Sequence, residues 1–188
     1  FQQAKEDGVT VLEIGEDVWG LKEFFHNDID ELVESFTSAQ REIAPEIELR
    51  LQIGLSRHCP ISYLEDCLSY FWGNKNFYSI DLYGDEFAQP IENFKGIYRR
   101  AKKEGLRLKA HVGEWGTAKD IRTAVEELEL DEVQHGIAAA GDESVIRFLA
   151  ENKIRLNITP TSNVLLGRVA DMAEHPIGKL YRSGIDVT

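Results

Sequence analysis

The strongest constraint on the fold is a regular alternation of two sequence patterns. Short apolar runs alternate with longer segments in which apolar residues recur every three to four positions. The short runs favour strands and the longer period favours helices, so the alternation predicts repeated βα units. The expected strands lie at residues 8–14, 47–53, 77–82, 106–111, 132–135 and 153–158, with the beginning of a seventh at 185–187.

A helical segment follows each expected strand. Two of these segments carry local signals for their first turn: Thr117 and Asp120 form a capping-box-like pair, and Asp142 is suited to cap the next helix. After the sixth strand the spacing predicts one helix near residues 164–173 and a second that opens around His175.

Six complete βα units and a strand stub predict an α/β fold, either a parallel barrel or a doubly wound sheet. No insertion is large enough for another domain, so residues 1–188 are expected to form a single domain. A full (βα)₈ TIM barrel usually needs about 250 residues. The sequence therefore favours an incomplete (βα)₈ TIM barrel that lacks roughly its first and last units, with both ends, Phe1 and Thr188, reading as cut.

Composition limits the partners and the location of the chain. The 33 acidic and 21 basic side chains give a formal net charge of −12 and a pI of about 4.9. Because binding to nucleic acid depends on Lys and Arg, we expect no nucleic-acid partner. No apolar run reaches the roughly 18 residues of a membrane span, so we also expect no membrane partner. Cys59 and Cys67 form neither a CxxC motif nor a disulfide framework, which favours a cytoplasmic location.

Polar side chains gather where the expected strands end. His111 ends the fourth strand, Glu114 follows three residues later, and His135 ends the fifth strand. The carboxyl ends of parallel strands carry the active site in such folds. One histidine can bind a metal, the carboxylate can move protons and the second histidine can hold a hydroxide, so this set suits metal-assisted hydrolysis. Asp81, near the end of the third strand, fits equally a buried structural carboxylate and a site residue.

Five short motifs follow one another along the chain. They are Ile80–Glu86, His111–Glu114, His135–Gly136, Thr159–Asn163, and His175–Pro176 with Leu180 and Gly184 after it. In order and spacing they resemble the adenosine deaminase family, over about residues 77–188. The resemblance implies a zinc-dependent (βα)₈ amidohydrolase that replaces the 6-amino group of a purine with oxygen.

The resemblance also implies roles for individual residues. His111 matches the zinc ligand, and Glu114 matches the residue that exchanges protons with the purine ring nitrogen and the attacking water. His135 matches the histidine that positions the zinc-bound hydroxide, and Asn163 belongs to a segment that supports the site. Gly84 matches a glycine whose backbone contacts the purine, although glycine there also suits a positive-φ turn. The implied cofactor is one zinc ion and the implied substrate is a purine nucleoside or base.

The family's other zinc ligands have no counterpart in the sequence. They come from a His-x-His pair on the first strand and an Asp-Asp pair at the eighth, so only His111 of four ligands is present. A catalytic zinc normally needs about three protein ligands. We therefore expect the parent enzyme to deaminate adenosine or a related aminopurine and the isolated chain to be inactive.

Two other hypotheses stay open. The chain fits a non-catalytic degenerate barrel that binds a small molecule or a protein, and an open barrel can self-associate through its unpaired edges. Among the remaining residues, His175 before Pro176 favours a helix-start role over a ligand role, and His58 is expected in a loop at the catalytic end. Trp115 is bulky for a loop beside the substrate, which leaves the exact purine open.

Overall fold

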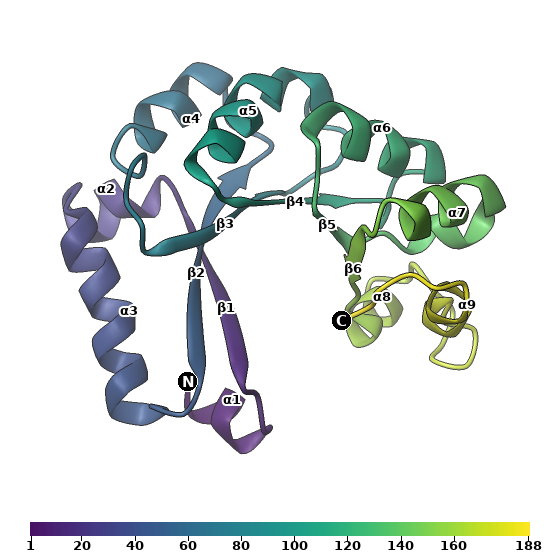
Figure 1. The fold of residues 1–188 in the computed structure, drawn as a ribbon, viewed down its shortest axis with the longest axis horizontal. Helices are drawn as coiled ribbons and strands as arrows, with labels where there is room; N and C mark the ends of the chain where they lie inside the picture. Colours follow the sequence, from purple (N-terminus) through teal and green to yellow (C-terminus); the bar gives the residue numbers. More distant parts are fainter.

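The computed structural model describes residues 1–188, which fold around one six-stranded parallel sheet. The strands are β1 Val11–Asp17, β2 Glu48–Ser56, β3 Phe77–Tyr83, β4 Arg107–Val112, β5 Glu132–His135 and β6 Arg155–Asn157. Each strand pairs only with the next along the chain, and the sheet curls into an arc whose two edges are β1 and β6 (Figure 1). A doubly wound sheet would reverse its strand order at a switch point. The incomplete barrel is therefore confirmed and the doubly wound alternative is wrong.

The helices surround the sheet: most cover the outer side of the arc, one lies at the start of β1 and two follow β6 (Figure 1). They are α1 Gln2–Glu6, α2 Gly20–Phe25, α3 Ile29–Ile43, α4 Ile61–Leu68, α5 Lys95–Glu104, α6 Ala118–Leu128, α7 Glu143–Glu151, α8 Pro160–Leu165 and α9 Ile177–Arg182, with 3₁₀ turns η1 Ile91–Phe94 and η2 Ile137–Gly141. None of these helices is both long enough and apolar enough to cross a membrane.

The predicted caps are present. The Thr117 side chain accepts from the Asp120 amide, and the Asp120 carboxylate accepts from the Thr117 amide at 2.7 Å, so α6 begins with a full capping box. The Asp142 carboxylate accepts from the amides of Ser144 and Val145 at the start of α7. These bonds satisfy amides that have no partner inside the helix, which is why both helices begin where the sequence predicts.

Strand side chains alternate between an apolar outer face and a polar inner face. The outward residues pack under the helices and are nearly all inaccessible to solvent; they include Ile53, Leu55, Ile80, Leu82, Leu108, Ala110, Val133 and Leu156. The inward residues of neighbouring strands lie in register, as Asp81 with Lys109 and Lys109 with Glu132. Apolar burial between sheet and helices therefore stabilises the arc from outside, and its inner face needs polar pairing.

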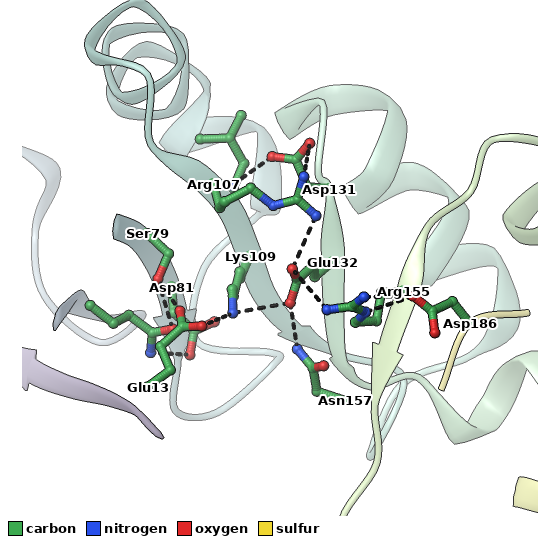
Figure 2. A network of polar contacts seen from close by, with 12 residues as sticks. Glu13, Ser79, Asp81, Arg107, Lys109, Asp131, Glu132, Arg155, Asn157 and Asp186 are labelled. Carbon is green, nitrogen blue, oxygen red and sulfur yellow. Dashed lines mark hydrogen bonds and ion pairs between the residues drawn. The ribbon is translucent and has the colours of Figure 1, made fainter. Parts of the chain in front are cut away.

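That pairing is provided by a network centred on Lys109 (Figure 2). Its Nζ lies 2.7 Å from Glu13 Oε2 and 3.0 Å from Glu132 Oε2, although the Lys109 residue is only 4% exposed. Glu132 also accepts from Asn157 Nδ2 at 2.9 Å and from Arg107 Nη2 at 3.1 Å. A buried charge is tolerated only when it is paired and hydrogen-bonded, so the network joins β1, β4, β5 and β6 through compensated charges.

The C-terminal region differs from the predicted helix at 164–173. The α8 helix ends at Leu165, and Gly167 takes a positive φ of 67°. The Asn163 carbonyl then accepts from the amides of Arg168 at 2.8 Å and Val169 at 3.3 Å, which turns the chain away from a continued helix. The predicted strand beginning is present as a parallel bridge between Leu156 and Val187.

Candidate active site

The fold brings the predicted polar residues to one end of the sheet. His111 lies on β4 and His135 ends β5, and their ring centroids are 5.3 Å apart. Glu114 lies on the loop after β4, with its Oε1 3.4 Å from His135 Nδ1. These three residues lie close together because neighbouring parallel strands present their carboxyl ends at the same edge of the sheet.

The Asp81 side chain on β3 lies beside the His111 ring. The Asp81 carboxylate is 2% exposed, and its Oδ2 lies 3.1 Å from His111 Nδ1. Burial lowers the pKa of His111, but the neighbouring Asp81 carboxylate outweighs it and the net pKa of His111 is raised. A carboxylate on Nδ1 is the usual partner of a metal-ligating histidine and leaves Nε2 facing the metal position. Asp81 is therefore both buried and in contact with a predicted site residue.

Asn163 joins Glu114 to His135. Asn163 is fully buried; its Nδ2 donates to Glu114 Oε1 at 2.8 Å and lies 3.2 Å from His135 Nδ1. Burial lowers the pKa of His135, an effect that the Glu114 charge opposes and that His111 reinforces. The neutral imidazole is thereby favoured, and a neutral ring has one nitrogen that accepts and one that donates.

The loop that carries Glu114 is held by Glu86. Glu86 is 6% exposed, and its carboxylate accepts four backbone amide bonds, from Gly113 at 2.7 Å, Glu114 at 2.9 Å, Trp115 at 2.8 Å and Gly116 at 3.2 Å. A side chain at Gly116 would bring Cβ within 2.8 Å of Glu86 Oε2, so glycine permits this close approach. Glu86 ends the motif Ile80–Glu86, but its contact with the loop around Glu114 was not predicted; the glycines on either side of Glu114 were the local signal for a close approach there.

Gly84 follows β3 with a φ of 98°. A Cβ there would also lie 3.2 Å from His58 Cδ2, and His58 Nε2 accepts from the Asp85 amide at 3.4 Å. The turn therefore requires glycine on conformational grounds, whatever else its backbone contacts. Next to it, Gly84, Asp85, Phe87 and Trp115 line a cavity of about 330 Å³.

Trp115 is tied to the rest of the rim by Arg168. The Arg168 guanidinium carbon lies 4.4 Å from the Trp115 ring centroid, and its Nε donates to the Glu114 carbonyl at 2.9 Å. Both Trp115 and Phe87 remain exposed, at 47% and 69%. The rim of the site is thus aromatic, with one cation stacked on it.

The residues that are present do not by themselves form a zinc site. No group of three or more His, Cys, Asp or Glu side chains in residues 1–188 is arranged to hold a metal ion. His111, backed by Asp81, has the geometry of a single ligand, and both cysteines are free thiols in the region of β2 and α4. A catalytic zinc needs about three protein ligands, so the fit of this donor set to zinc is incomplete.

Comparisons with known proteins agree with this arrangement. The family pattern described as adenosine deaminase matches residues 6–188. A Treponema pallidum protein described as an adenosine/adenine deaminase is 39% identical over all of this chain and 62% of its own length. An adenine deaminase of Rhodopseudomonas palustris is 30% identical over the whole chain and 55% of its own length. The chain thus spans a little over half the length of these relatives.

Solved structures place the fold in the same group. The adenine deaminase of Arthrobacter aurescens superposes with a TM-score of 0.84 at 26% identity, covering 99% of this chain and 57% of that one. A Burkholderia amidohydrolase with bound zinc superposes with a TM-score of 0.82 at 22% identity, covering 98% and 53%; at that identity the likeness concerns the fold alone. Since the family pattern covers nearly the whole sequence, the chain belongs to the adenosine deaminase family.

Proposed function

We propose that residues 1–188 carry part of the active site of an enzyme that hydrolytically deaminates adenine, adenosine or a related aminopurine. The observation that carries this proposal is the contact of Glu114 and His135 through Asn163, with the His111 ring 5.3 Å from that of His135. The relatives named adenine or adenosine deaminases support the substrate class.

The proposed roles follow from the chemistry of each side chain. Glu114 exchanges a proton between the attacking water and the purine ring nitrogen, since a carboxylate held beside a neutral histidine can accept and return a proton. His135 orients the attacking oxygen. His111 is the one zinc ligand, and the Gly84 backbone contacts the purine. Zinc would need ligands beyond those that residues 1–188 bring together, and we propose that the isolated chain is inactive.

Zinc content tests the metal part of the proposal. After exhaustive dialysis, elemental analysis of the purified chain is expected to give a zinc-to-protein ratio near zero, because a lone histidine binds zinc weakly. A ratio near one would contradict the inactive-fragment proposal and would require ligands from elsewhere, such as a second copy.

Ammonia release tests the reaction. Residues 1–188 with added zinc are expected not to turn over adenine or adenosine. The same residues flanked by a His-x-His strand and an Asp-Asp turn should deaminate one of them. In that active protein Glu114→Gln should retain zinc and lose activity by a factor on the order of 10² or more; near-normal turnover would refute the proton-transfer role.

A non-catalytic binding module is the second candidate, and the incomplete metal site is the observation that favours it. It predicts saturable binding of a purine to residues 1–188 without turnover in any longer form. Self-association is a related proposal, because the sheet is not closed: β1 has an unpaired edge, and beyond β6 only residues 186–188 continue the pairing. Sedimentation analysis at increasing concentration distinguishes a monomer from an edge-paired dimer.

We propose a cytoplasmic location on the cysteine usage alone.

A further inference from the structure

Four side chains from separate segments form a continuous polar chain next to the site. His175 precedes α9, Asn163 lies on α8, Glu114 lies on the loop after β4, and His135 ends β5. His175 and Asn163 are 8% and 0% exposed, so water cannot readily replace their hydrogen bonds. Each bond in this chain therefore needs one donor and one acceptor from the protein.

The direction of the chain is set by a backbone amide. The Ile177 amide donates to His175 Nδ1 at 3.1 Å. A backbone N–H can only donate, so Nδ1 of His175 carries no proton. Burial also lowers the pKa of His175, which favours the neutral ring. The single ring proton of His175 then lies on Nε2.

That proton fixes the orientation of the Asn163 amide. His175 Nε2 lies 3.2 Å from Asn163 Oδ1 and donates to it. The amide NH₂ consequently faces Glu114 Oε1 at 2.8 Å and His135 Nδ1 at 3.2 Å. The flipped amide would set its NH₂ against the His175 N–H and its carbonyl oxygen against the Glu114 carboxylate, losing both bonds.

The Asn163 amide in turn sets the tautomer of His135. Asn163 Nδ2 is a donor 3.2 Å from His135 Nδ1, while the Glu114 Oε1 acceptor lies farther from that nitrogen, at 3.4 Å, so the geometry favours an Nδ1 that accepts and carries no proton. Thr159 Oγ1 lies 3.2 Å from the same nitrogen and can donate to it as well. The proton of neutral His135 is therefore held on Nε2, the nitrogen on the other side of the ring.

We propose that His175 and Asn163 act as a tautomer relay: positioning residues that hold the His135 proton on Nε2 and fix one carboxylate oxygen of Glu114. The catalytic consequence rests on the proposed function, in which the Nε2–H of His135 donates to the attacking oxygen. The relay itself is a property of these four side chains and can be tested without activity. It gives His175 a second role besides the helix start at Ile177.

The test is proton–nitrogen correlation NMR of the chain with isotope-labelled histidine, at a pH alkaline of the His135 titration. In the unmodified chain we expect His135 as the Nε2–H tautomer and His175 as the same tautomer. Asn163→Leu removes the NH₂ donor and leaves Glu114 Oε1, 3.4 Å away, as an acceptor beside His135 Nδ1, so it should move the His135 proton onto Nδ1. His175→Phe, which leaves Asn163 free to flip, should give a mixture of both tautomers. His26→Asn, at an exposed position after α2, is the control and should leave the pattern unchanged.

Backbone amide spectra report whether each variant folds, and the two substitutions offer independent routes if one does not. An unmodified chain with His135 protonated on Nδ1 overturns the relay, as does a folded Asn163→Leu or His175→Phe variant with an unchanged His135 tautomer. In an active longer form, Asn163→Leu should reduce kcat on the order of 10²-fold with a much smaller change in KM. If no deaminase activity is found in any form, the tautomer result still decides the relay, so the two failures are distinguishable.

Discussion

The Glu86 carboxylate accepts a hydrogen bond from the Glu114 backbone amide at 2.9 Å, across 28 positions of sequence. Together with three neighbouring amide bonds, this fixes the backbone of the loop that presents the Glu114 side chain. A carboxylate that accepts several backbone bonds is an anion enclosed by N–H groups, and its removal leaves those groups buried without partners.

We expect Glu86→Gln to loosen residues 113–116, because the Gln NH₂ group would face amide donors. The free energy of unfolding of the variant should be lower by about 1–3 kcal/mol. Its amide hydrogen exchange should be faster in that loop only. Glu92→Gln, an exposed glutamate on η1, is the matched control and should behave as the unmodified chain. Unchanged protection of the loop in Glu86→Gln would contradict this role.

Lys109→Met should destabilise the chain strongly. The substitution retains most of the side-chain volume but leaves Glu13 and Glu132 without the cation between them. Breaking a buried pair from one side costs about 3–5 kcal/mol, measured by urea unfolding. Lys103→Met, on the exposed side of α5, is expected to change stability by less than about 0.5 kcal/mol. Equal effects of the two substitutions would refute the pairing argument.

Glu132 gives the fold a dependence on acid. Burial raises its pKa, but the hydrogen bonds from Asn157 and Lys109 outweigh burial, so the pKa of Glu132 is lowered below its ordinary value of 4.5. A lowered pKa means that the ionised form stabilises the fold above the ordinary pKa, and this contribution is lost as pH falls through the folded-state pKa. The urea concentration at half unfolding should therefore decrease as the pH falls below about 4.5, and it should decrease less steeply in Glu132→Gln. Identical acid profiles would show that other carboxylates dominate.

Gly84→Ala tests the turn beside the candidate site. The added methyl group must accept a positive φ of 98° and a contact of 3.2 Å with His58, so we expect a loss of about 1 kcal/mol or more in chemical unfolding. Gly96→Ala in α5 has no atom within 4 Å of the new Cβ and should instead stabilise the chain by a few tenths to about 1 kcal/mol. A neutral Gly84→Ala would mean that this turn tolerates a side chain.

The local part of this structure was predictable from the sequence. The period of apolar residues located the strands, since it depends only on neighbouring residues. The capping residues located the starts of α6 and α7, since a cap bonds within the first turn of its helix. The strand-end rule then placed His111, His135 and Glu114 together. The order of the strands required the structure, since both a barrel and a doubly wound sheet satisfy the same local patterns.

Contacts between distant segments were not predictable in the same way. Lys109 pairs with Glu13, which precedes it by 96 positions, and nothing in either local pattern specifies the partner. Asn163 bonds to Glu114 across 49 positions, and its amide orientation depends on a backbone N–H beyond His175. The missed turn at Gly167 has a different cause: it is local, because the Asn163 carbonyl accepts from the amides of Arg168 and Val169 around a glycine with positive φ.

The sequential strand order also bears on how the chain folds. Every strand pairs with its immediate neighbour along the sequence, so each pairing closes only the loop of one βα unit. Such a topology has low contact order for a parallel sheet and allows structure to grow unit by unit from any nucleus, as in repeat proteins. Fraying should accordingly begin at β1, which has a neighbour on only one side, and at residues 186–188, which form the last backbone bonds beyond β6, and it should reach β3 and β4 last.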